Sequence, residues 1–110
     1  MHIHILDDDK VRHDIFAERF RGHDVQHCYD VKRFRIYYSS RTWDLVHLDH
    51  DLGTKETGMN AVDYMVELSD DRRPGRVVVH SWNPDGSKLM AATLHRYGFN
   101  VERKMFEVKP

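Results

Sequence analysis

Five short apolar segments alternate with four longer amphipathic segments along the chain, and this alternation constrains the fold more than any other feature. The segments with the character of strands are residues 1–6, 25–29, 44–49, 76–80 and 99–105. Those with the character of helices are residues 10–21, 31–38, 59–68 and 84–97. Strands that alternate with helices predict a parallel sheet with helices on both faces, because right-handed crossovers place the helices there.

Particular residues support this interpretation of the segments. The three consecutive valines at 77–79 form an apolar run that is typical of a strand buried on both faces. The first helix is expected to bury the residues at helical spacing, which are Val11, Ile15, either Phe16 or Ala17, Arg19 and Phe20. Gly98 is expected to end the last helix, because glycine readily adopts the backbone conformation that follows a helix.

The predicted class is α/β, a three-layer αβα sandwich of the flavodoxin-like type. At 110 residues we expect a single domain that spans residues 1–110. The common solution at this size is a five-stranded parallel sheet with strand order 2-1-3-4-5. Compared with a complete five-fold unit the chain lacks the last helix, since residues 107–110 are too few to form one.

Composition excludes several classes of protein. The formal net charge is -1, so no global positive field favours strong non-specific binding to nucleic acid. No apolar run approaches the roughly 20 residues that span a bilayer, so we expect no membrane partner. Cys28 is the only cysteine, which rules out an internal disulfide and favours a reducing, cytoplasmic location.

Polar residues gather where three of the predicted strands end. Residues 7–9 follow the first strand, residues 49–51 the third, and residues 80–83 the fourth. In open sheets of this order, ligands bind beyond the carboxyl ends of the strands, where the strand order reverses. We therefore expect these three stretches to meet in one crevice.

The acidic residues of this crevice need a counter-charge, because neighbouring carboxylates cannot all stay ionised without one. A hard divalent cation supplies it, and carboxylate oxygens are the ligands that Mg²⁺ prefers. We expect Asp7, Asp8 and Asp49 to bind the metal. The alternative for residues 7–9 is that they cap the helix that begins at Lys10 and interact favourably with its dipole.

His50 and His80 are the candidate groups for proton transfer, because imidazole titrates near neutral pH. The alternative is that each is a hydrogen-bonded structural histidine at the end of a strand. Asp49 and Asp51 complete the candidate catalytic set, with Asp51 expected to orient a histidine.

The remaining candidates are residues that could contact a substrate. Asn83 and Thr57 are each suited to cap a helix, and each could also donate a hydrogen bond to an anion. Trp82 is expected either to pack or to stack on a base. The full set of expected substrate-binding residues is Thr57, Gly58, Ser81, Trp82, Asn83 and Lys104.

Over nearly its whole length the chain resembles the receiver domains of two-component signalling. Those domains have paired acids after the first strand, a phosphoaccepting aspartate after the third, a Ser or Thr after the fourth and a lysine after the fifth. The matching positions here are Asp7 with Asp8, Asp49, Ser81 and Lys104. The chain departs from them in His50-Asp51, in the run 80–83, and in Met105 where receivers usually have proline.

These departures are similar to the signature of a narrower family, the cyclic-phosphate processing receiver-like domains. The motifs that carry this resemblance are "LDDD", "LDHDLG", "TG" and "VHSWNP", in that order along the chain. The resemblance implies processing of a cyclic phosphate of a ribose, either an RNA 2′,3′-cyclic end or a small cyclic nucleotide, and we expect a metal-assisted hydrolase. A metal-free mechanism that uses the two histidines, with the acids orienting the imidazoles, is the alternative on the same residues. The alternatives are a stand-alone phosphoreceiver that is phosphorylated on Asp49, and a non-catalytic nucleotide-binding protein.

Overall fold

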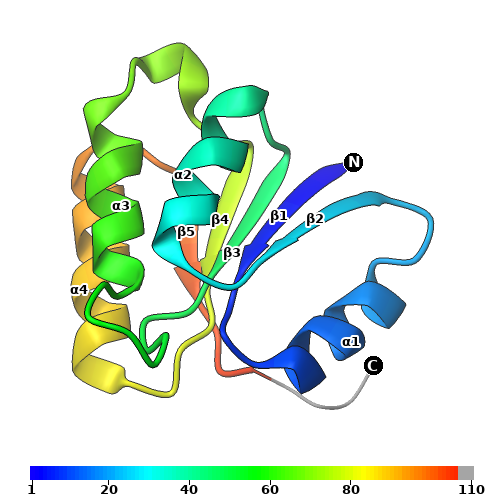
Figure 1. The fold of residues 1–110 in the computed structure, drawn as a ribbon. Helices are drawn as coiled ribbons and strands as arrows, with labels where there is room; N and C mark the ends of the chain where they lie inside the picture. Colours follow the sequence, from blue (N-terminus) through cyan, green and yellow to red (C-terminus); the bar gives the residue numbers. More distant parts are fainter. Residues whose placement is uncertain (107–110) are drawn as a thin grey trace.

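The computed structural model describes residues 1–106 (Figure 1). Its sheet consists of five parallel strands in the order β2-β1-β3-β4-β5. The strands are β1 (His2–Leu6), β2 (Asp24–Cys28), β3 (Leu45–Leu48), β4 (Arg76–Val79) and β5 (Val101–Arg103). The helices are α1 (Lys10–Arg19), α2 (Val31–Ser40), α3 (Gly58–Glu67), α4 (Pro84–Arg96) and the short 3₁₀ helix η1 (Asp70–Arg72). The predicted α/β class and strand order are confirmed. The predicted lack of a last helix concerns residues 107–110, which lie outside the described part of the chain.

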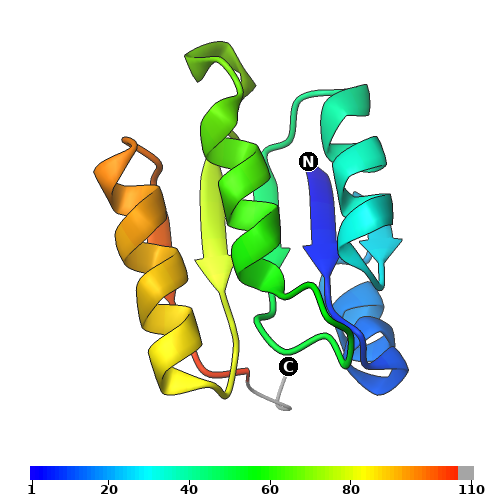
Figure 2. The ribbon, with the colours of Figure 1, turned by 60° about the vertical axis from the view of Figure 1, so that its left-hand side comes forward.

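Helices cover both faces of the sheet, as Figure 2 shows when the molecule is turned. Strand residues that alternate in direction divide the core between the two faces. Val46, Leu48 and Val77 belong to the larger cluster, which α2, α3 and α4 cover. Ile5 and Val78 belong to the smaller cluster, which α1 covers. No helix within residues 1–106 has the length and apolar character needed to cross a membrane.

Two local predictions were wrong. The fifth strand covers Val101–Arg103 and not residues 99–105, because β4 pairs with it only through residues 77–79. Val11 was predicted to be buried but is 66% exposed. Phe16, one of the alternatives for the buried face, is buried, and so is His13, which was not predicted. His13 faces the sheet because its Nε2 donates a hydrogen bond to the carbonyl oxygen of Asp7 at 2.7 Å.

His4 of β1 is a buried histidine that packs against α2. The ring of His4 stacks on Phe34 and on Trp43, with ring centroids 4.6 and 4.7 Å apart. Its Nε2 lies 3.2 Å from the sulfur of Cys28, and that thiol donates to the carbonyl oxygen of Ile5. Burial lowers the pKa of His4 to about 3 and raises the pKa of the Cys28 thiol. Both groups are therefore neutral in the folded protein near neutral pH.

The burial of His4 predicts that the protein loses stability in mild acid. The unfolded chain binds a proton at His4 below its ordinary pKa of about 6.5, whereas the folded chain does not bind one until about pH 3. The free energy of unfolding is not reduced by His4 above the pKa of the unfolded chain, and it falls by about 2 kcal/mol between about pH 7 and about pH 5. Urea unfolding at these two pH values measures the loss. The variant His4→Leu, which cannot titrate there, should lose correspondingly less, and an equal loss would contradict the assignment.

Candidate functional site

An arginine holds together the ends of the two central strands. Nε of Arg12 donates to Oδ2 of Asp7 at 2.7 Å, and Nη2 donates to Oδ1 of the same carboxylate at 2.9 Å. The same Nη2 donates to Oδ2 of Asp49 at 3.3 Å. The sequence predicts that the carboxylates at the strand ends need a counter-charge, and this guanidinium provides it. Sequence reasoning missed Arg12.

The start of α1 places Arg12 over the strand ends. Asp9 is the N-cap, and its side chain accepts hydrogen bonds from the backbone nitrogens of Val11 and Arg12. Nη1 of Arg12 also lies 3.3 Å from a carboxylate oxygen of Asp9. The capping role considered for residues 7–9 thus belongs to Asp9, and Asp7 and Asp8 are left for the pocket.

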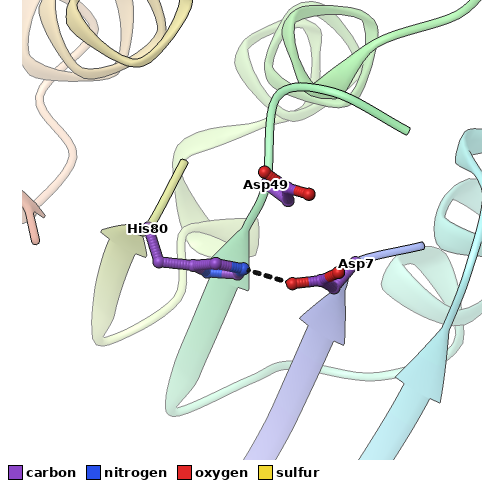
Figure 3. Close-up of side chains that lie close together, drawn as sticks. All are labelled: Asp7, Asp49 and His80. Atoms are coloured by element: carbon purple, nitrogen blue, oxygen red, sulfur yellow. Dashed lines mark hydrogen bonds and ion pairs between the residues drawn. The ribbon is translucent and has the colours of Figure 1, made fainter. Parts of the chain in front are cut away.

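Asp7, Asp49 and His80 come from three neighbouring strand ends and meet in one buried group (Figure 3). Nε2 of His80 lies 2.8 Å from Oδ2 of Asp7. One potential ligand atom from each residue lies within 4.8 Å of the other two. All three side chains are buried, so the charges of this group are weakly screened by water.

The two carboxylates of this group differ in their affinity for a proton. Burial opposes ionisation of Asp7, but hydrogen bonds from His80 and Arg12 outweigh it and lower its pKa to about 2. Burial and the charge of Asp7 raise the pKa of Asp49 to about 6. Because Asp7 is ionised it can only accept, so Nε2 of His80 carries the proton that they share. Nδ1 of His80 is buried and has no hydrogen-bond partner within residues 1–106.

His50 belongs to a second, more exposed group beside α4. Its Nδ1 lies 2.7 Å from Oδ1 of Asp51, and the side-chain amide of Asn83 donates to the same oxygen at 3.3 Å. The ring lies against Gly86, where a β-carbon would come within 2.5 Å of it. Within residues 1–106, no hydrogen bond or ion pair joins His50 to Asp7 or His80. The two predicted histidines therefore belong to separate groups, each paired with an aspartate.

The start of α3 supports the strand end that carries Asp49. A β-carbon on Gly58 would lie 2.0 Å from the carbonyl oxygen of Asp49, so only glycine permits this approach. Thr57 is the N-cap, and its hydroxyl accepts from the backbone nitrogen of Met59. Asn60 completes a capping box by accepting from the nitrogen of Thr57. The capping role considered for Thr57 is thus present.

Three further predicted residues lie around the β4–α4 connection and the end of β5. The hydroxyl of Ser81 accepts from the backbone nitrogen of Asn83 at 3.1 Å. Ser81 and Lys104 both line a hollow of about 210 Å³. Trp82 is 61% exposed, so it does not pack into the core.

In this arrangement Asp7 is not free to bind the predicted Mg²⁺. Oδ1 of Asp7 accepts from the backbone nitrogen of Asp9 and from Arg12, and Oδ2 accepts from Arg12 and His80. These four hydrogen bonds use the roughly four acceptor positions of a carboxylate. Asp7 has no lone pair left for a metal while Arg12 and His80 stay in place. The acidic cluster is present, but its cation is a guanidinium.

Comparison with known families matches residues 3–96 to the cyclic-phosphate processing receiver domain. No curated protein matches the chain.

Several solved receiver structures share the fold. A response regulator from Burkholderia pseudomallei with a phosphorylated aspartic acid, calcium ion and citrate has a TM-score of 0.70 at 20% identity, covering 97% of this chain and 61% of that one. The phosphorylated cyanobacterial phytochrome response regulator RcpA has a TM-score of 0.76 at 18% identity, covering 96% and 80%. The receiver domain of NtrX from Brucella abortus has a TM-score of 0.69 at 23% identity, covering 96% of this chain and 88% of that one. The chain spans less than two thirds of the first of these, and at such identities the likeness shows the fold alone.

Proposed function

Since the chain belongs to the family of cyclic-phosphate processing receiver domains, we propose that it hydrolyses a cyclic phosphate on a ribose. One observation carries this proposal, the surroundings of Asp49. The guanidinium of Arg12 lies 3.3 Å from its carboxylate, and the next residue is His50, which is paired with Asp51. A proton acceptor and a cation suited to phosphate thus lie together at the end of β3, and the oriented imidazole belongs to the next residue of the chain.

The proposed reaction opens the five-membered ring with one water molecule. Asp49 accepts a proton from the water as its oxygen bonds to phosphorus. Nη1 of Arg12, whose one ion pair within residues 1–106 is with Asp9, donates a hydrogen bond to a phosphoryl oxygen and stabilises its charge as phosphorus becomes five-coordinate. The bond from phosphorus to one ribose oxygen breaks, and His50, in its protonated form, donates a proton to that oxygen. Transfer of the proton from Asp49 back to His50 through solvent then restores both groups, and the product is a phosphate monoester.

His80 and Asp7 act in this proposal as positioning residues. Both are buried, and their hydrogen bond at 2.8 Å fixes the carboxylate that holds Arg12. The sequence-based role of His80 as an acid or base is thereby moved to His50, which is nearer the surface.

The other predicted residues are proposed to bind the substrate. Trp82 presents an exposed indole on which a base could stack. Ser81 accepts one hydrogen bond and keeps its own O–H for a phosphate oxygen, and Lys104 lies at the same hollow. Asn83 orients Asp51, and Gly58 supports Asp49.

Mg²⁺ stays a prediction from the sequence and has no step in this reaction. The reason is the arrangement of Asp7, whose oxygens are already occupied by Arg12, His80 and a backbone nitrogen.

The second candidate is a phosphoreceiver that accepts a phosphoryl group on Asp49. It is favoured by the likeness to solved receiver structures, one of which contains a phosphorylated aspartic acid. Asp49 directly follows β3, as the acceptor does in the receiver pattern.

Phosphorus NMR tests the proposal against both alternatives. The protein is incubated with 2′,3′-cyclic AMP and with an RNA that ends in a 2′,3′-cyclic phosphate, each with Mg²⁺ and with chelator. A second arm contains acetyl phosphate. We expect conversion of a cyclic phosphate to a monoester in chelator as well as in Mg²⁺. A phosphoprotein signal without turnover would replace the proposal with the phosphoreceiver, and binding without any product would indicate a nucleotide-binding protein.

A further inference from the structure

One nitrogen of Arg12 lies where three carboxylates converge. Nη2 is 2.9 Å from Oδ1 of Asp7, 3.3 Å from Oδ2 of Asp49 and 3.5 Å from Oδ1 of Asp8. These are the same three residues that the sequence predicts as ligands of Mg²⁺. The guanidinium thus contacts every carboxylate that a divalent cation in this pocket would use.

We propose that Arg12 is the resident cation of the pocket, and that a divalent metal ion binds there only when the guanidinium is displaced. The two cations exclude each other for reasons of space and of charge. Nη2 already occupies the region between the carboxylates, and a dication placed next to a guanidinium in a buried site would be repelled by it.

The chain is built to keep the guanidinium in place. Arg12 belongs to the first turn of α1, whose N-cap Asp9 binds its backbone nitrogen and lies 3.3 Å from its Nη1. Its fork makes two parallel hydrogen bonds to Asp7, a geometry that an ammonium group cannot reproduce. Because the arginine is part of the chain, its effective concentration at the carboxylates is high, and a free ion must compete with it.

This inference concerns cation binding alone, so it stands or fails separately from the hydrolysis of a cyclic phosphate. Its measurements use no substrate. A protein that hydrolyses nothing can still have Arg12 as its cation, and a hydrolase can turn out to bind metal.

The test is to remove the guanidinium and measure metal binding. Free Mn²⁺ is followed by electron paramagnetic resonance during titration of the wild-type protein and of Arg12→Met. Loss of two or more charge-assisted hydrogen bonds that the ion would otherwise have to break should tighten Mn²⁺ binding by about 100-fold or more. Lys10→Met is the matched control, because Lys10 is an exposed cation on the same helix that pairs with Asp14. It should bind Mn²⁺ as the wild type does.

Equal affinity of the wild type and Arg12→Met for Mn²⁺ would overturn the inference. Arg12→Met could fail to fold, since three carboxylates would lose their cation, so the wild-type protein gives a second measurement. Its unfolding midpoint in urea should be the same in millimolar Mn²⁺ as in chelator at equal ionic strength. A rise of the midpoint with Mn²⁺ in the wild type would show that Arg12 does not keep the ion out of the pocket at this concentration and would also overturn the inference.

Discussion

Replacing His50 with glutamine is expected to lower the turnover of a 2′,3′-cyclic nucleotide by about 100- to 10,000-fold, the usual contribution of a general acid. Glutamine keeps a side chain of similar size against Gly86 but has no proton to donate to the departing ribose oxygen. The substitution should leave labelling of Asp49 by acetyl phosphate unchanged, because transfer to a carboxylate requires no imidazole. Initial rates measured by phosphorus NMR or by chromatography give the comparison.

The matched control for this variant is His95→Gln. His95 lies in the last turn of α4, is exposed, and is at the opposite end of that helix from Gly86. It should retain the wild-type rate and the wild-type urea midpoint. Full activity in His50→Gln would show that His50 is not the general acid and would contradict the proposed reaction.

Replacing Asp7 with asparagine is expected to destabilise the folded protein by about 3–5 kcal/mol, the effect of removing one partner from a buried ion pair. The side chain of Asp7 is 0% exposed, and it accepts hydrogen bonds from Arg12, His80 and the nitrogen of Asp9. An asparagine presents two N–H groups to these donors and carries no charge to balance the guanidinium. For a domain of this size such a loss is a large part of the total free energy of unfolding.

Asp8→Asn is the control for this prediction. Asp8 is adjacent, but its side chain is 35% exposed and lies 3.5 Å from the guanidinium. Its loss should change the free energy of unfolding by less than about 1 kcal/mol, as for other exposed ion pairs. Urea unfolding followed by circular dichroism measures both variants. Similar losses in the two would mean that the position of Asp7 is not special.

The fold and the location of the site were predictable because they depend on periodicity. Valines 77–79 and the alternation of the other segments identify a parallel sheet, and a parallel sheet of this order places the ends of β1, β3 and β4 together. Asp7, Asp49 and His80 each directly follow one of these strands, so their meeting follows from topology alone.

Arg12 was not predictable from periodicity, because an arginine in the first turn of a helix is usually solvated. Its direction depends on where the helix begins, which Asp9 determines by capping the nitrogens of Val11 and Arg12. One signal was available in the sequence. The strand ends required a cation, and Arg12 is the first arginine after the acidic residues 7–9.

The separation of the two histidines depends on side-chain direction at the strand ends. His80 turns to the face that α1 covers, where its ring packs on Phe16 at 5.2 Å. His50 lies against α4 because Gly86 leaves room for its ring. The positions of the strand ends predict that His50 and His80 lie along the same edge of the sheet. They do not predict that the ring of His50 turns to Gly86 of α4 while the ring of His80 turns to Phe16 of α1.

The first turn of α1 carries both the residue that starts the helix and the residue that neutralises the pocket. Packing of this helix against the sheet and neutralisation of the acidic side chains by Arg12 therefore occur together. If α1 moved away from the sheet, it would withdraw the positive charge with it, and the mutual repulsion of the exposed acids would favour its return unless a proton or another cation arrived first.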